Sequence, residues 1–166
     1  PPPPPDPRPA APEPPPGPFV LYVGALNGRK NVQGVMATVR QLLRTRPDLS
    51  AVFVGSGASA YADTGLGASD DRIVFTGAID DHALDAHYRA AALMLFPSLH
   101  EASGLPPLEA MARGCPVVVS DIPALRERCG AAAEYCDPQD VASILAAAER
   151  VLDDPGRRRD LVEAGR

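Results

Sequence analysis

The sequence predicts an α/β fold in which a doubly wound, Rossmann-like parallel sheet of about six strands carries helices on both faces. Two observations support this prediction. The expected strands are short and apolar throughout, which is typical of parallel strands buried on both faces. They alternate along the chain with segments of helical periodicity, and right-handed connections between such units give a doubly wound sheet.

Most of the expected strands end at glycine or proline, residues that interrupt extended backbone pairing. We expect five clear strands and a weaker sixth, at residues 19–23, 51–54, 72–75, 92–96, 117–119 and 131–135. The last of them is weaker because it is less apolar than the others.

Two of the expected helices carry a complete apolar stripe. In the first, Val32, Val35, Met36, Val39, Leu42 and Leu43 recur at the spacing of one helical face, and the same spacing returns between Val141 and Leu152. Further helices are expected at residues 80–89, 107–113 and 122–128, and from about 157 onward. Residues 56–70 are rich in Gly, Ser, Ala and Asp and are expected to form a loop with at most one short helix.

Proline divides the chain into two parts. Twelve of the 20 prolines fall in residues 1–18, and such a stretch lacks backbone donors and favours extended polyproline II. Residues 1–18 are therefore predicted to be a semi-rigid linker, and residues 19–166 one domain with enough apolar residues for a core. The start without Met and the end inside a helical pattern suggest the C-terminal domain of a longer protein.

Composition excludes several classes of protein. No run of about 18 apolar residues could span a bilayer, and no signal peptide is present at the start. A net charge of −5 argues against a nucleic-acid binder. The three cysteines lack metal-ligand spacing and are expected to be reduced thiols in a cytoplasmic protein. No Asp-x-Asp motif suggests a metal ion beside a diphosphate, so neither a metal nor a cofactor is expected.

Ligands of doubly wound folds bind at the carboxyl ends of the strands, so the loops there are the candidate sites. The first such loop, Gly24 to Asn31, has two glycines and the adjacent cations Arg29 and Lys30 at the start of a helix. A helix start favours anions, and a diphosphate would suit this loop. An exposed turn with a solvated Arg-Lys pair would give the same pattern, and the loop alone does not decide between them.

The second loop, Gly55 to Ala60, has the pattern GxGxxA and supports an alternative, a dinucleotide-binding oxidoreductase of the NAD type. The pattern follows the second strand instead of the first, and the acidic residue expected about 20 residues later is only loosely matched by Asp71. A plain turn is the favoured interpretation.

The third loop, HEASGLPPLE at residues 100–109, carries the strongest signal. Glu101 and Glu109 lie eight residues apart, one in the loop and one on the following helix. Carboxylates accept hydrogen bonds from sugar hydroxyls, while the backbone amides of Gly104 and Leu105 at a helix start favour an anion. Together they suit a nucleotide-sugar. The alternative is a surface Glu101 and a Glu109 that interacts only with the helix dipole.

These residues also carry a family resemblance. The stretch VFTGAIDDHALDAHYRAAALMLFPSLHEASGLPPLEAMARGCPVVVSDIPALRE, together with YVGALNGRKN, resembles the donor-binding C-terminal domain of retaining GT-B glycosyltransferases, family 4, also called glycosyl transferases group 1. Glu101 and Glu109 fit the E-x7-E motif of that family. The resemblance covers about residues 19–166.

The resemblance implies a role for each site residue. Arg29 and Lys30 would hold the donor diphosphate and stabilise the leaving group, and Glu101 would contact the sugar hydroxyls. Glu109 would contact the ribose, and backbone amides of the loop before it would meet phosphate or sugar. The remaining donor-binding positions implied are Gly24 at the first turn, Gly77 and Ile79 near the base, and Ser103, Gly104 and Leu105 near the sugar and phosphates.

Two positions depart from the family pattern. Many members have Arg directly after the first-loop Gly, where this chain has Ala25, and a bulky aromatic residue where it has Ser103. Arg29 could supply the missing cation, while Ser103 suggests a different fit around the sugar.

The implied function is transfer of a hexose from a GDP- or UDP-linked sugar, with retained configuration and without a metal. The acceptor would be bound by an N-terminal domain that this chain lacks, so we expect the chain alone to be inactive. Any peripheral membrane contact would come through that domain. The alternatives are a nucleotide-binding module or inactive relative, a nucleotide-sugar epimerase or phosphorylase, and the NAD-type enzyme.

Overall fold

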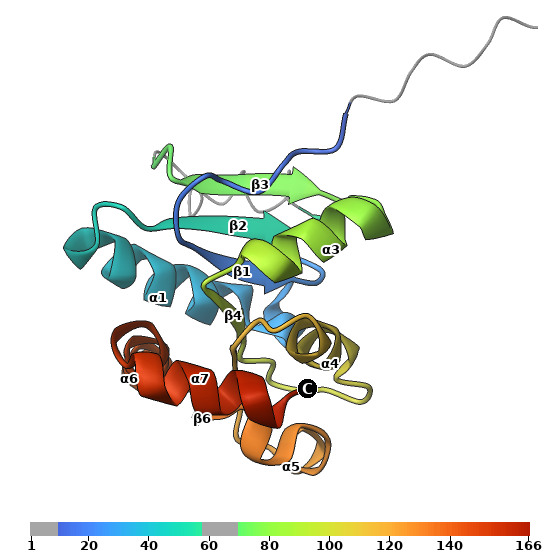
Figure 1. The fold of residues 1–166 in the computed structure, drawn as a ribbon, viewed down its shortest axis with the longest axis vertical. Helices are drawn as coiled ribbons and strands as arrows, with labels where there is room; N and C mark the ends of the chain where they lie inside the picture. The colour runs from blue at the N-terminus through green and yellow to red at the C-terminus, as the bar shows by residue number, and fades with distance from the viewer. Residues whose placement is uncertain (1–9, 58–69) are drawn as a thin grey trace, which may run out of the picture.

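The described residues, 10–57 and 70–166 of a computed structural model, form a six-stranded parallel sheet (Figure 1). Residues 1–9 of the proposed linker and 58–69 of the expected loop lie outside the described residues, and so does the end of the GxGxxA pattern. The strand order is β3-β2-β1-β4-β5-β6. The strands are β1 (Phe19–Val23), β2 (Ser50–Val54), β3 (Ile73–Gly77), β4 (Leu93–Phe96), β5 (Val117–Ser120) and β6 (Glu134–Cys136).

Helices cover both faces of this sheet. One face packs against α1 (Val32–Thr45) and α6 (Val141–Asp153), and α7 (Pro155–Ala164) packs on α6. The other face is covered by α3 (Asp81–Ala90), α4 (Leu105–Ala112) and α5 (Pro123–Cys129). The apolar side chains of the strands alternate between these two cores, as buried parallel strands require. The predicted doubly wound α/β fold is confirmed.

Three boundaries differ from the sequence-based expectation. The third strand continues to Gly77, because it stays paired with β2 through a register irregularity after Phe53. Helix α4 begins at Leu105 instead of Pro107, since the prolines fit a first turn that needs no amide donors. The sixth strand is only Glu134–Cys136, because a 3-10 turn at Gly130–Ala132 occupies the start of the expected range.

The strand order changes direction at β1, which pairs with β2 on one side and β4 on the other. The connections leaving β1 and β4 go to opposite faces of the sheet, so their first residues separate above the sheet edge and leave room between them. The loop at residues 24–31 and the loop at residues 97–104 therefore border one opening. Both had been predicted from the sequence as candidate sites.

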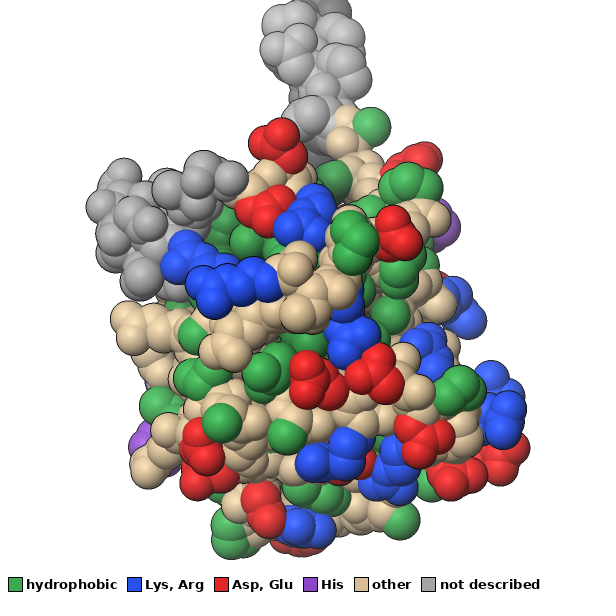
Figure 2. Space-filling model, turned by 90° about the vertical axis from the view of Figure 1, so that its left-hand side faces the viewer, with side chains coloured by type: hydrophobic (Ala, Val, Ile, Leu, Met, Phe, Trp, Pro, Cys, Tyr) green, Lys and Arg blue, Asp and Glu red, His purple; other side chains and the backbone are tan. Residues whose placement is uncertain are grey.

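The opposite edge, where the strands begin, carries acidic and basic side chains interspersed with one another (Figure 2). Two ion pairs of that region are Arg46–Asp153 and Arg72–Asp70. Exposed pairs of this kind add little to stability. Among the described residues, no helix is long and apolar enough to cross a membrane.

Gly55 fixes the distance between the loops after β1 and β2. Its φ of 144° lies in the region that favours glycine, and its amide donates to Gly77 O at 3.0 Å. A Cβ at this position would lie 1.9 Å from Gly24 O, so no side chain fits unless one loop moves. Packing against Gly24 thus explains why the first position of the GxGxxA pattern is glycine in this fold.

We expect Gly55→Ala to lower the free energy of unfolding by more than about 2 kcal/mol, because the clash adds to backbone strain. Chemical denaturation measures this loss. Gly28→Ala is the matched control, since Gly28 has open space around its Cβ position and no unusual φ. Equal stability of the two variants would show that the loops can separate freely.

Candidate functional site

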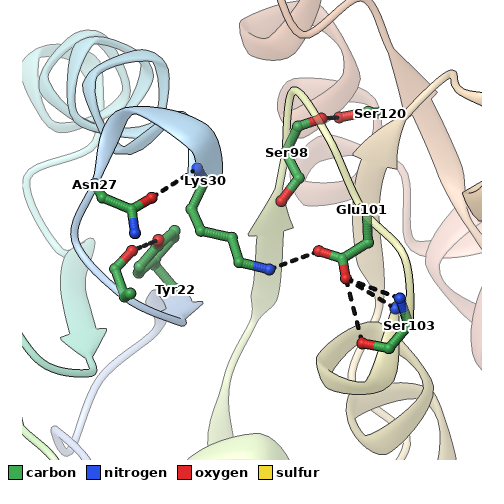
Figure 3. A network of polar contacts seen from close by, with 9 residues as sticks. Tyr22, Asn27, Lys30, Ser98, Glu101, Ser103 and Ser120 are labelled. Carbon is green, nitrogen blue, oxygen red and sulfur yellow. Dashed lines mark hydrogen bonds and ion pairs between the residues drawn. The ribbon is translucent and has the colours of Figure 1, made fainter.

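Lys30 and Glu101 meet across the opening between the ends of β1 and β4 (Figure 3). Lys30 Nζ donates to Glu101 Oε2 at 2.6 Å, although the two residues are 71 positions apart in the sequence. The ammonium also lies 5.2 Å from the ring centroid of Phe96, the last residue of β4, at cation–π range. The side chain of Lys30 keeps 19% of its exposure, whereas that of Glu101 keeps 3%.

Lys30 is positioned by the structure of its own loop. Residues Gly28–Lys30 form one 3-10 turn, and Asn27 Oδ1 caps it by accepting from the Lys30 amide at 3.1 Å. Behind the turn, the buried Tyr22 hydroxyl donates to Ala25 O at 2.6 Å. The loop at residues 24–31 is therefore tied at both ends, and the Lys30 side chain leaves it toward Glu101.

Asn31 connects this loop to two others. Its backbone has a φ of 58°, the left-handed conformation that asparagine tolerates better than most residues. Its Nδ2 donates to Pro97 O at 2.9 Å and to Pro138 O at 2.7 Å. The loops after β1, β4 and β6 thus share one amide side chain, which keeps the edge of the site together.

The Glu101 carboxylate is held on both of its oxygens. Oε2 accepts a hydrogen bond from Lys30 Nζ, while Oε1 accepts from the amides of Ser103 and Gly104 at 3.2 and 3.1 Å and from Ser103 Oγ at 3.3 Å. Burial raises its pKa, but these hydrogen bonds and the Lys30 charge together outweigh burial and lower it to about 2. Glu101 is therefore ionised at neutral pH and acts as an acceptor, not as an acid.

Gly104 and Leu105 mark the start of α4. Gly104 caps the helix with a φ of 59°, and its amide is already used by Glu101. Within the described part of the chain, no group accepts a hydrogen bond from the Leu105 amide. Pro106 and Pro107 have no amide hydrogen, so the Leu105 amide is the donor that this turn can offer to an anion.

Glu109 lies one turn further along α4 and is half-buried. Its Oε2 accepts a hydrogen bond at 3.0 Å from the hydroxyl of Tyr88, a buried residue of α3. The two glutamates of the E-x7-E spacing are therefore held by different partners on different parts of the same connection. Glu101 belongs to the loop and Glu109 to the helix.

The other predicted positions lie around this centre. Gly24 directly follows β1, and its amide donates to Val54 O at 2.9 Å. Gly77 is the last residue of β3, and Ile79 lies half-buried in the connection from β3 to α3. Arg29 is exposed. It lines a cavity of about 530 Å³ together with His100, Glu101 and the start of α5. Glu101 therefore borders this cavity and also pairs with Lys30.

No group of three or more His, Cys, Asp or Glu side chains could hold a metal ion among residues 10–57 and 70–166. The three cysteines are buried and free, and burial raises the pKa of Cys115 and Cys136 to about 12. The charged chemistry of the site therefore comes from Lys30, Glu101 and Glu109.

Comparisons with known proteins agree with this geometry. Residues 6–166 match the family of glycosyl transferases group 1. The chain belongs to this family. It is 34% identical over 146 residues to O-antigen chain mannosyltransferase B of Escherichia coli. The matched residues cover 84% of this chain and 38% of that protein. It is 36% identical over 155 residues to glycogen synthase of Mycobacterium tuberculosis, with 89% and 37% covered.

Solved structures share this fold. Sucrose-phosphate synthase of Thermosynechococcus elongatus superposes with a TM-score of 0.75 at 31% identity, covering 90% of this chain and 40% of that one. The C-terminal domain of a group 1 glycosyl transferase of Francisella tularensis gives 0.78 at 24% identity, with 90% and 83% covered, and shows the fold alone. The chain spans about two fifths of the length of the curated relatives that it matches.

Sequence reasoning missed three residues that organise the site. Asn27 and Asn31 flank the 3-10 turn, and an asparagine on each side of a predicted helix start was an available signal for caps. Tyr88 gave no signal of its own, because its partner Glu109 is 21 residues away and a tyrosine at a helical core position has an ordinary packing explanation.

Removing the Lys30 charge should raise the pKa of Glu101 above about 2. The lowered pKa means that ionised Glu101 contributes stability that is complete above the ordinary glutamate pKa of 4.5 and is lost as pH falls toward 2. A carboxyl carbon NMR titration of wild type and Lys30→Met measures the pKa directly. Arg126→Met, which breaks the exposed Arg126–Asp121 pair, is the control and should leave the Glu101 titration unchanged.

Proposed function

We propose that this chain is the donor-binding half of a retaining, metal-independent glycosyltransferase. It would bind a GDP- or UDP-linked hexose for transfer to an acceptor held by another part of the whole protein. The observation that carries the proposal is the Lys30–Glu101 pair at the point where the strand order changes direction, with Glu109 on the helix that follows. Membership of the glycosyl transferases group 1 supports it.

The side chains offer what each part of such a donor needs. Lys30 has three donor hydrogens, so it can keep its hydrogen bond to Glu101 and still donate to a phosphate oxygen. The Leu105 amide would be a second donor to the phosphate. The ionised Glu101 accepts sugar hydroxyls, and Glu109 accepts ribose hydroxyls. Gly77 and Ile79 would border the base through their backbone, while Gly24 and Ser103 leave space where a larger side chain would intrude.

The chemical step breaks the bond between the anomeric carbon and the diphosphate oxygen and forms a bond from that carbon to an acceptor oxygen. The nucleoside diphosphate takes the bonding electrons, and its departing oxygen takes the proton that the acceptor hydroxyl gives up. Lys30 would stabilise the negative charge that develops on the leaving oxygen, the role that a divalent ion has in other transferases. Arg29, which lines the cavity that Glu101 also borders, would supply a second cation beside the diphosphate.

The alternatives have less support in the structure. The GxGxxA pattern follows β2, and its first glycine is explained by contact with Gly24, so nothing at the described positions favours an NAD-type enzyme. An epimerase, a phosphorylase or an inactive relative would share the donor site and differ in the acceptor side. We expect the chain alone to bind a donor nucleotide without measurable transfer, because it spans only about two fifths of the length of the transferases that it matches.

Calorimetry with UDP, GDP and ADP tests the proposal. We expect at least one of them to bind, and Lys30→Ala to weaken that binding about tenfold or more because a charge-assisted hydrogen bond is lost. Arg44→Ala removes an exposed cation from the far end of α1 and serves as control. A folded wild-type chain that binds none of the three, or that binds NAD instead, would overturn the proposal.

A second test uses the fact that Lys30 is the only lysine in the sequence. An amine-acylating reagent can therefore modify only Lys30 and the terminal amine, which mass spectrometry separates. We expect a bound nucleoside diphosphate to slow acylation of Lys30 severalfold and to leave the terminal amine unaffected. If saturating nucleotide left the acylation rate of Lys30 unchanged, the diphosphate would have to bind elsewhere.

A further inference from the structure

Four side chains join α3 to α4 on the face of the sheet below the candidate site. Tyr88 and Asp85 come from α3, Glu109 comes from α4, and Arg113 directly follows the last residue of α4. We call this group the α3–α4 brace. The two helices lie on the same face of the sheet (Figure 1), and the brace connects them.

Arg113 makes the structural connections of the brace. Its Nε donates to Asp85 Oδ1 at 2.6 Å, and its Nη1 donates to the backbone oxygen of Glu109 at 3.0 Å. Its guanidinium carbon lies 5.5 Å from the centroid of the Tyr88 ring, at cation–π range. These contacts fix the spacing of the helices without any use of the Glu109 carboxylate.

The Tyr88 hydroxyl makes a different kind of contact. It donates to Glu109 Oε2 at 3.0 Å from a ring that is only 1% exposed, so its direction is fixed by packing. Burial, together with the Glu109 charge, raises the pKa of Tyr88, so the hydroxyl stays protonated and remains a donor at neutral pH. Among the described residues, no group donates to the other carboxylate oxygen, Glu109 Oε1.

We propose that Tyr88 is a positioning residue that orients Glu109 so that the site selects ribonucleotides over 2′-deoxyribonucleotides. The inference rests on the proposed function and adds to it the residue that sets the direction of the ribose acceptor. Tyr88 does not touch the nucleotide, and it acts through the carboxylate.

The geometry explains how such selection would arise. A carboxylate has about four acceptor positions, and the Tyr88 hydroxyl occupies one of them on Oε2. The remaining positions can accept both hydroxyls of a ribose, provided that the group does not rotate about its last bonds. A 2′-deoxyribose offers one hydroxyl fewer and leaves part of the oriented carboxylate unpaired, which costs affinity.

A purely structural role for Tyr88 would have another consequence. If its hydroxyl only tied α3 to α4, its removal would weaken binding of ribonucleotides and deoxyribonucleotides by the same factor. If it orients Glu109, its removal weakens ribonucleotide binding alone, because the deoxyribonucleotide depends less on this carboxylate. The ratio of the two affinities therefore separates the two roles.

The experiment measures binding of the preferred nucleoside diphosphate and of its 2′-deoxy form by calorimetry, for the 166-residue chain and for Tyr88→Phe. We expect wild type to prefer the ribonucleotide about tenfold or more, and Tyr88→Phe to reduce that preference severalfold while deoxyribonucleotide affinity changes little. Thermal unfolding of each protein verifies that the variant is folded.

Tyr135→Phe, on β6, is the matched control, because it also removes one tyrosine hydroxyl. That hydroxyl donates to Gly130 O at 2.7 Å. This variant should leave both affinities and their ratio unchanged. Glu109→Gln is a second variant, whose carboxamide has one acceptor oxygen, and it should reduce the ribose preference even if Tyr88→Phe proves unstable.

The outcomes separate the two proposals. If wild type binds no nucleoside diphosphate, the proposed function fails and the inference fails with it. If wild type binds the ribonucleotide and the deoxyribonucleotide equally, the inference is overturned and the proposed function stands. The same holds if Tyr88→Phe weakens binding of both nucleotides by the same factor. A lower ratio in Tyr88→Phe and Glu109→Gln, with an unchanged ratio in Tyr135→Phe, supports the inference.

Discussion

The parallel pairing of β1 with β4 is the constraint on which the candidate site depends. Because these strands lie side by side while their connections leave toward opposite faces, the loop at residues 24–31 and the loop at residues 97–104 face one another across an opening. Lys30 and Glu101, far apart in the sequence, meet there at hydrogen-bond distance. Neither side chain could be brought to the other by local structure alone.

Charge within this opening is organised before any ligand arrives. The buried Glu101 carboxylate would be costly without compensation, and Lys30 and two backbone amides supply it. This arrangement holds the 101–104 loop in one conformation at the start of α4. Glu109 is held separately by Tyr88, so the two carboxylates keep independent orientations although one short segment carries both.

The sequence was sufficient for the fold and for the loops that form the site, because apolar strands, helical stripes and strand-ending glycines are local patterns. Lys30, Glu101 and Glu109 were singled out by their residue types and spacing, and the structure brings Lys30 and Glu101 to hydrogen-bond distance. The directions of the side chains could not be predicted, because tertiary packing sets them. Lys30 reaches Glu101 across 71 positions of the sequence, while Asn31 and Tyr88 also act through partners distant in the chain.

The contact between Gly55 and Gly24 has a consequence for motion. With no space for even one methyl group between Gly24 and Gly55, the first residues after β1 and β2 form one closely packed floor under the site. Adjustment to an incoming molecule is therefore left to long side chains that stand on this floor, Lys30 above all. Recognition at this edge would proceed by exchange of hydrogen-bond partners, with the backbone beneath it unchanged.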